Sequence, residues 1–223
     1  MATGLTLRAG TSGELARYVA GQLDRFFADA GLAADEERAR SCVEPALERL
    51  RPILAAVRNF EPDRFDHFHA LQYATFLYLL ARQSALGGAG HTFADRLFCL
   101  NRALNAIDLY HAVRMPEVFF ISHGLGSVLG NADYGDRLVV FQGVTVGRVG
   151  EQRPSVGCDV VLYPGASITG CAVVGDRCVI GAGVQLHGES IPSDSVVSLR
   201  AGTLSIAPRK RDYAALYFRH SLC

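Results

Sequence analysis

A repeat with a period of six residues is the feature of this sequence that most limits how the chain can fold. Every sixth position from Val156 is aliphatic, and the members are Val156, Leu162, Ile168, Val174, Ile180 and Leu186. A second set of positions, each two residues before the following aliphatic position, holds small or medium-sized residues. Its members are Val160, Ala166, Ala172, Cys178, Val184 and Ser190. A strand repeats every two residues and a helix every 3.6, so neither produces this pattern. A fixed longer period indicates a solenoid.

Each hexapeptide predicts one short strand and one turn, with three hexapeptides in each triangular coil. The aliphatic residues then point to the axis and stack on their equivalents one coil away. The same frame continues upstream from Tyr134 to Gly147. Between Val146 and Val156 the step is ten residues, so residues 148–155 are predicted to leave the solenoid as a loop. A polar loop extruded from a strict repeat is usually functional.

The first half of the sequence has helical periodicity instead. Thr11 and Glu14 have the spacing of a capping box, and helices are predicted after it and at about residues 35–58, 64–85 and 93–107. Pro45 and Pro52 are predicted to kink or split the second helix, and Gly87, Gly88 and Gly90 to end the third. By contrast, 15 of the 23 glycines lie between residues 124 and 202, beside many Val and Ile residues, which favours short strands and tight turns.

These patterns predict an α+β protein with an N-terminal α-helical domain followed by a left-handed parallel β-helix of hexapeptide repeats. The expected domains are residues 1–107, residues 108–206 and a C-terminal tail or short helix over residues 207–223.

Composition limits the classes of function. The 223 residues include 22 Lys and Arg and 22 Asp and Glu, so no bulk charge favours nucleic acid or a membrane surface. No apolar run is long enough for a membrane span and no secretory signal is recognised, so a cytoplasmic location is expected. The six cysteines show neither CxxC nor zinc spacing, and we expect free thiols and no metal.

Four short motifs carry a resemblance to a known family. They are Ser122-His123-Gly124-x-Gly126, Leu129-Gly130-Asn131, Gln142-Gly143-Val144-Thr145-Val146-Gly147 and Arg153-Pro154-x-Val156. They resemble Asp-His-Ala-x-Gly, Ile-Gly-Glu, Gln-Ser-Val-Thr-Leu-Gly and His-Pro-x-Ile of serine O-acetyltransferases, which are hexapeptide-repeat acyltransferases. The resemblance runs from about Asp108 to Ile206.

The resemblance implies that His123 is the general base. Acyl transfer to a hydroxyl requires a group that removes the hydroxyl proton, and histidine titrates near neutrality. Asp108 lies fifteen residues upstream, the spacing of the family's catalytic Asp. An aspartate bonded to the far ring nitrogen would orient the imidazole.

The resemblance also implies two binding regions. The acceptor region comprises Arg153, which replaces a family histidine, Gln152 and Asn131, which replaces a family glutamate. A guanidinium fork suits a carboxylate. Acetyl-CoA, the expected co-substrate, is placed in a groove between neighbouring β-helices, against the residues Gly143, Pro164, Gly165, Gly181, Ala182 and Arg200.

The expected function is therefore acetyl-CoA-dependent O-acetylation of serine or a related small amino acid. The alternatives are the same chemistry on another acceptor, such as an amino sugar or a biosynthetic intermediate, a γ-type carbonic anhydrase and a non-catalytic scaffold. The donor groove needs two walls, which predicts a homotrimer or a dimer of trimers. Small molecules are the expected ligands, with no nucleic acid or membrane partner. Binding to a cysteine synthase is doubtful, because the chain does not end in the family's terminal Ile.

Overall fold

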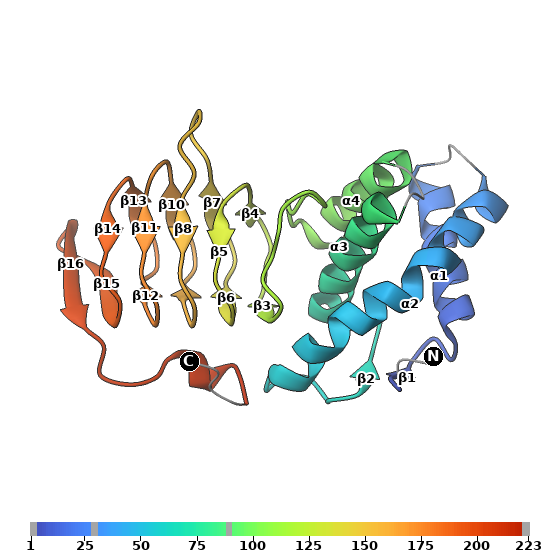
Figure 1. Cartoon of the computed structure of the whole chain (residues 1–223), viewed down its shortest axis with the longest axis horizontal. Helices are drawn as coiled ribbons and strands as arrows, with labels where there is room; N and C mark the ends of the chain where they lie inside the picture. Colours follow the sequence, from blue (N-terminus) through green and yellow to red (C-terminus); the bar gives the residue numbers. More distant parts are fainter. Residues whose placement is uncertain (1–3, 28–30, 88–90, 220–223) are drawn as a thin grey trace. The chain divides into compact units, whose positions relative to one another are not determined.

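The computed structural model describes residues 4–27, 31–87 and 91–219. Contacts divide the chain into two compact units, each with its own fold (Figure 1). The first contains most of residues 4–106 together with residues 110–112. The second contains residues from 113 onward and also Ala56–Asn59 and Ile107–Leu109. The predicted architecture, four N-terminal helices followed by a parallel β-helix, is confirmed.

The first unit is a helical domain. Its helices are α1 (Ser12–Phe26), α2 (Leu32–Ala56), α3 (Ala70–Leu86) and α4 (His91–Asn105), and a short parallel pair joins β1 (Thr6–Leu7) to β2 (Arg64–Phe65). The capping box before α1 is confirmed, since Thr11 accepts from the Glu14 amide and Glu14 from that of Thr11. Neither Pro45 nor Pro52 splits α2.

The predicted third helix began too early. Residues 64–65 pair with β1 instead of starting a helix, and α3 begins at Ala70, after a turn in which Asp66 accepts from the Phe68 amide. Gly87 is the C-cap of α3. Gly88 and Gly90, which were predicted to help end this helix, lie outside the described residues, as does Cys223.

The second unit is a three-sided solenoid whose strands stack into three sheets (Figure 1). The first sheet contains β3 (Phe119–Ile121), β6 (Leu138–Val140), β9 (Val161–Leu162), β12 (Val179–Ile180), β15 (Ser195–Arg200) and β16 (Thr203–Pro208). The second contains β4 (Val128–Leu129), β7 (Thr145–Gly147), β10 (Ser167–Thr169) and β13 (Gln185–His187). The third contains β5 (Asp133–Tyr134), β8 (Ser155–Val156), β11 (Val173–Val174) and β14 (Ser190–Ile191). Pairing is parallel except between β15 and β16.

The aliphatic side chains of the repeat form the axial core. All six predicted axial residues, Val156 to Leu186, are at most 2% exposed. Five of the six predicted small positions are fully buried, but Ser190 is exposed. The reason is that the corner before β14 is one residue shorter than the corner before β11, so Ile191 takes the next axial position and Ser190 faces outward.

The three corners of the solenoid have different chemistry. The glycine corner, between the first and second sheets, stacks Gly126, Gly143, Gly165 and Gly183. The loop corner, between the second and third sheets, carries the predicted loop, which lies between β7 and β8 and projects from the solenoid (Figure 1). The Arg–Asp corner, between the third and first sheets, stacks Arg137, Asp159, Arg177 and Asp194, all with φ between 54° and 61°.

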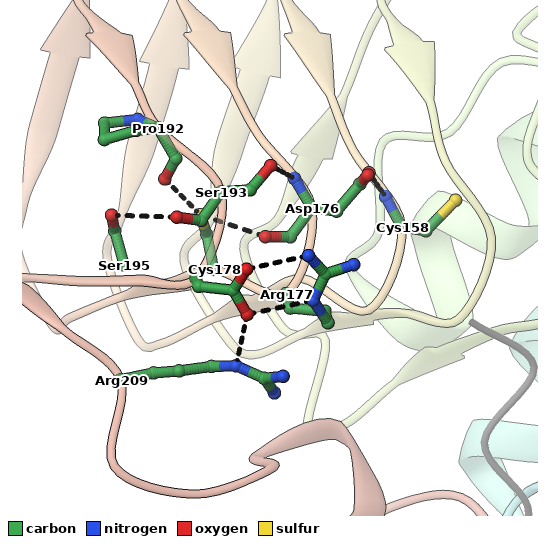
Figure 2. Close-up of polar contacts among 9 residues, drawn as sticks. Cys158, Asp176, Arg177, Cys178, Pro192, Ser193, Ser195 and Arg209 are labelled. Atoms are coloured by element: carbon green, nitrogen blue, oxygen red, sulfur yellow. Dashed lines mark hydrogen bonds and ion pairs between the residues drawn. The ribbon is translucent and has the colours of Figure 1, made fainter.

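Ion pairs join neighbouring coils at the Arg–Asp corner. Arg137 and Asp159 form a buried pair. In the last coils Arg177 donates two hydrogen bonds to Asp194, which also accepts from Arg209 (Figure 2). Hydrogen bonds from Arg177 and then Arg209 lower the pKa of Asp194 from 3.8 to about 2.

This depressed pKa predicts an acid-sensitive contribution to stability. A carboxyl group whose pKa is lower in the folded state stabilises the protein fully above its unfolded pKa. We expect Asp194→Asn to be less stable than the wild type above about pH 4, with the difference shrinking as the pH falls from about 4 to 2. Urea unfolding of both proteins across this range measures it. A difference that stays constant down to pH 2 would contradict the assignment.

The end of the described chain packs against the outer face of the first sheet. A 3₁₀-helix (Ala214–Leu216) leads to Phe218, which is buried and bridges to Val57. The Phe218 ring lies 5.0 Å from the Arg137 guanidinium carbon, which places an aromatic face against the buried ion pair.

Candidate active site

His123 lies at the glycine corner, in the turn between β3 and β4. That turn comprises residues 122–127 and is two residues longer than the turns at residues 141–144, 163–166 and 181–184. The imidazole is exposed, and it makes no hydrogen bond to any residue within the described ranges. The extra residues therefore present an imidazole to solvent where the later coils present only short turns.

The backbone around His123 is tightly specified. His123 has φ 52°, a left-handed conformation uncommon outside glycine. The next residue, Gly124, is buried, and a Cβ there would lie 2.3 Å from the Ile121 side chain and 2.9 Å from that of Ile107. A side chain at position 124 would therefore displace the turn. Such constrained residues gather at functional sites.

Asp108 lies beside the same turn. Its amide donates to the Ser127 carbonyl at 2.9 Å, and its carbonyl accepts from the Leu129 amide at 2.8 Å. Asp108 thus extends the second sheet by one parallel bridge, to Val128. The structure brings the two predicted catalytic residues to one end of the solenoid, since His123 precedes this strand and Asp108 pairs with it.

The predicted acceptor residues lie at the loop corner. The loop is closed as a hairpin by reciprocal backbone hydrogen bonds between Val149 and Gln152. Arg153 follows directly, and its Nη2 donates to Asp133 Oδ2 at 2.7 Å. Asn131, Gln152, Asp133 and Arg153 are all exposed. Asp133 was not predicted from the sequence, because its pairing with the β8 segment spans the loop and so breaks the eighteen-residue coil period.

The predicted donor residues Gly143 and Gly165 belong to the glycine column. Each glycine of this column has φ between 66° and 72° and is exposed, and a Cβ on any of the first three would face the next glycine at 3.7–4.0 Å. The column therefore offers backbone without side chains along one edge of the solenoid. Gly126 and Gly183 extend it and were missed, although Gly183 lies one coil of eighteen residues after Gly165.

Among the other predicted donor residues, the fold by itself explains Gly181, whereas it only places Pro164, Ala182 and Arg200. A Cβ on Gly181 would lie 2.8 Å from the Val197 carbonyl oxygen, so coil stacking by itself requires this glycine. Pro164 and Ala182 lie in the turns of the glycine corner, with Ala182 exposed. β9 and β12 each end at the axial position that Val197 occupies in β15. β15 instead continues past Val197, which places the exposed Arg200 beyond this corner.

One solenoid does not bring all the predicted residues together. His123 and the glycine column lie on one side of the second sheet, whereas Arg153, Gln152 and Asn131 lie at the corner on its other side. Within the described residues, no three His, Cys, Asp or Glu side chains are arranged to hold a metal ion. Among the described helices, none is long and apolar enough to cross a membrane.

Comparison with known proteins agrees with this geometry. The bacterial transferase hexapeptide model (six repeats) matches residues 153–188. The serine acetyltransferase of Synechococcus elongatus is 35% identical over 103 residues, which are 44% of this chain and 42% of the relative, so the chain spans less than half of that protein. That of Helicobacter pylori is 30% identical over 117 residues, covering 50% of this chain and 68% of the relative.

Solved structures share the fold over most of the chain. The serine acetyltransferase of Vibrio cholerae superposes with a TM-score of 0.72 at 20% identity, covering 92% of this chain and 83% of that one. A serine acetyltransferase of Brucella abortus in complex with Coenzyme A gives 0.66 at 18% identity, covering 90% and 83%.

The three-sided solenoid and the matching repeats define a protein of the hexapeptide-repeat class. Within that class, the chain belongs to the serine acetyltransferase family.

Proposed function

We propose that this protein transfers the acetyl group of acetyl-CoA to the hydroxyl of serine or a related small amino acid. Family membership supports the reaction, and one structural observation supports the site. An exposed imidazole stands on the lengthened turn of the glycine corner, next to the strand to which Asp108 is paired. In this proposal His123 is the general base and Asp108 is the residue that orients it.

The proton balance of the reaction assigns the role of His123. Its imidazole takes the proton of the acceptor hydroxyl as the oxygen attacks the thioester carbonyl. The carbon–oxygen bond forms, the carbon–sulfur bond breaks, and the imidazolium returns the proton to the departing sulfur of CoA. A carboxylate on the far ring nitrogen fixes the tautomer and stabilises the imidazolium.

The glycine column supports a site for the donor. Because no Cβ covers this edge, a pantetheine arm can approach the backbone amides closely. In the proposal Gly143, Pro164, Gly165 and Ala182 line the arm, Gly181 holds the coil spacing, and Arg200 at the far coil meets the CoA phosphates.

The placement of the acceptor residues supports a site shared by two subunits. His123 and Arg153 lie at different corners of one solenoid, so a second copy is needed for Arg153, Gln152 and Asn131 to face the imidazole. We therefore propose a homotrimer, in which each solenoid meets two others. Sedimentation showing a fully active monomer would contradict it.

The reaction is tested by mixing the purified full chain with acetyl-CoA and a panel of acceptors. We expect loss of the thioester absorbance to be fastest with serine. The thioester signal is preferable to thiol detection, because Cys99 and Cys171 are exposed free thiols. A panel in which no hydroxy amino acid raises the rate above acetyl-CoA alone would contradict the proposal. An amino sugar as the best acceptor would retain the chemistry and replace the acceptor.

A further inference from the structure

We infer that Asp133 and Arg153 form one recognition site for a zwitterionic acceptor, with Arg153 binding its carboxylate and Asp133 its ammonium group. This rests on the proposed function and adds to it a reason for the choice of acceptor. Asp133 has no counterpart among the residues that the resemblance singled out, and its assignment comes from its contact with Arg153.

Two contacts fix Asp133 against the end of the loop. Its amide donates to the Pro154 carbonyl at 3.0 Å, which holds the start of β5 beside the loop. Its carboxylate accepts from Arg153 Nη2 at 2.7 Å. Arg153 is therefore held from two directions, by the hairpin that precedes it and by the neighbouring coil.

The pair is exposed and leaves groups free for a ligand. The side chains of Arg153 and Asp133 are 47% and 62% exposed. Within the described part of the chain, Asp133 is the only hydrogen-bond partner of the guanidinium, so Nε and Nη1 remain available, as does Asp133 Oδ1. Exposed ion pairs contribute little to stability, so this one is poorly explained as a structural device.

The charges match an amino acid and not its alternatives. A guanidinium presents several donors in one plane and can bind a carboxylate while keeping one contact to Asp133. A carboxylate accepts from an ammonium group, and adjacent opposite charges complement a zwitterion. An amino sugar offers only the ammonium group and a simple alcohol neither charge, so the pair selects the acceptor by charge before the hydroxyl reaches the base.

Three acceptors with the same primary hydroxyl distinguish recognition of the carboxylate from recognition of the ammonium group. L-Serine carries both, 3-hydroxypropanoate lacks the ammonium group, and ethanolamine lacks the carboxylate. We expect Asp133→Asn to raise the KM for serine about 10- to 100-fold, the range for a lost charged hydrogen bond, and to leave 3-hydroxypropanoate unchanged. We expect Arg153→Gln to impair serine and 3-hydroxypropanoate and to spare ethanolamine. Neither change should alter the KM for acetyl-CoA.

Asp194→Asn is the matched control. Asp194 also accepts from arginine across coils of the same solenoid, but at the Arg–Asp corner (Figure 2). Asp194→Asn should lower the stability of the protein and leave the KM for serine unchanged. This result would exclude a general effect of breaking an Arg–Asp pair.

The outcomes distinguish this inference from the proposed reaction. If Asp133→Asn changes serine and 3-hydroxypropanoate equally, or changes neither, the recognition role is wrong although the reaction stands. If the wild type turns over no acceptor, calorimetric titration with serine and 3-hydroxypropanoate replaces kinetics. Serine binding that Asp133→Asn selectively weakens would then keep the inference and remove the reaction. Absence of serine binding to the wild type would overturn both.

Discussion

Replacing His123 with alanine is expected to lower kcat by about 10²–10⁴-fold, the usual contribution of a general base. The acceptor hydroxyl then keeps its proton during attack on the thioester, whereas the donor and acceptor contacts remain. Steady-state kinetics with acetyl-CoA and serine measure the loss, and the binding of CoA to the variant should be nearly that of the wild type.

A second variant separates catalysis from folding. His123 has φ 52°, and alanine in this left-handed region is less favourable than asparagine. His123→Asn should therefore keep the turn, lack a base at neutral pH and lose as much activity as His123→Ala. Sedimentation of each variant should match that of the wild type. Unchanged kcat in either variant would remove His123 from its role.

Asp159→Asn is expected to reduce the free energy of unfolding by about 3–5 kcal/mol, the cost of removing one partner of a buried ion pair. Asp159 is 4% exposed and pairs with Arg137, which is 1% exposed and lies against Phe218. Asparagine keeps the side-chain shape and tolerates φ 57°, so the change leaves an uncompensated guanidinium in the core. The urea midpoint at constant m value measures the loss.

A double variant tests whether the buried charge is the cause. Arg137→Gln with Asp159→Asn removes both charges, so its loss of stability should be smaller than the sum of the two single losses. Asp194→Asn, at the equivalent position of a later coil, should cost much less, because Asp194 is about half exposed. Additive losses in the double variant would show that packing, and not charge, holds this corner.

The repeat made the solenoid predictable from the sequence. Every sixth residue must occupy the axis if short strands of equal length turn three times per coil, and the burial of Val156 to Leu186 follows from that geometry alone. The same counting located the loop between Val146 and Val156, because a step of ten residues cannot fit within one hexapeptide. Helix boundaries were less predictable. Residues 64–65 were included in the third predicted helix, but they pair with β1, and the helix begins only at Ala70.

The six-residue period predicted residue positions wrongly where an insertion or deletion changed the register of a coil. Ser190 was counted among the small positions of the repeat, and a corner one residue shorter exposes it, whereas the other five are buried. His123 and Gly143 carried motif signals and Asp108 a spacing signal, and the roles of all the predicted catalytic and donor residues remain predictions. Asp133 carried none, because its neighbours in space are set by turn lengths that a fixed period does not contain.

The sequence by itself determined the type of coil, the residues on its axis and the position of its loop, since these depend only on spacing along the chain. Tertiary structure alone decided which residues meet across coils: the side chains of Asp133 and Arg153, those of Asp159 and Arg137, and the backbone of Asp108 with the strand after His123. The physical reason is that spacing fixes which way each residue faces. Contact between coils depends on the summed lengths of all the turns between them, and these include the long turn of His123 and the loop before Arg153.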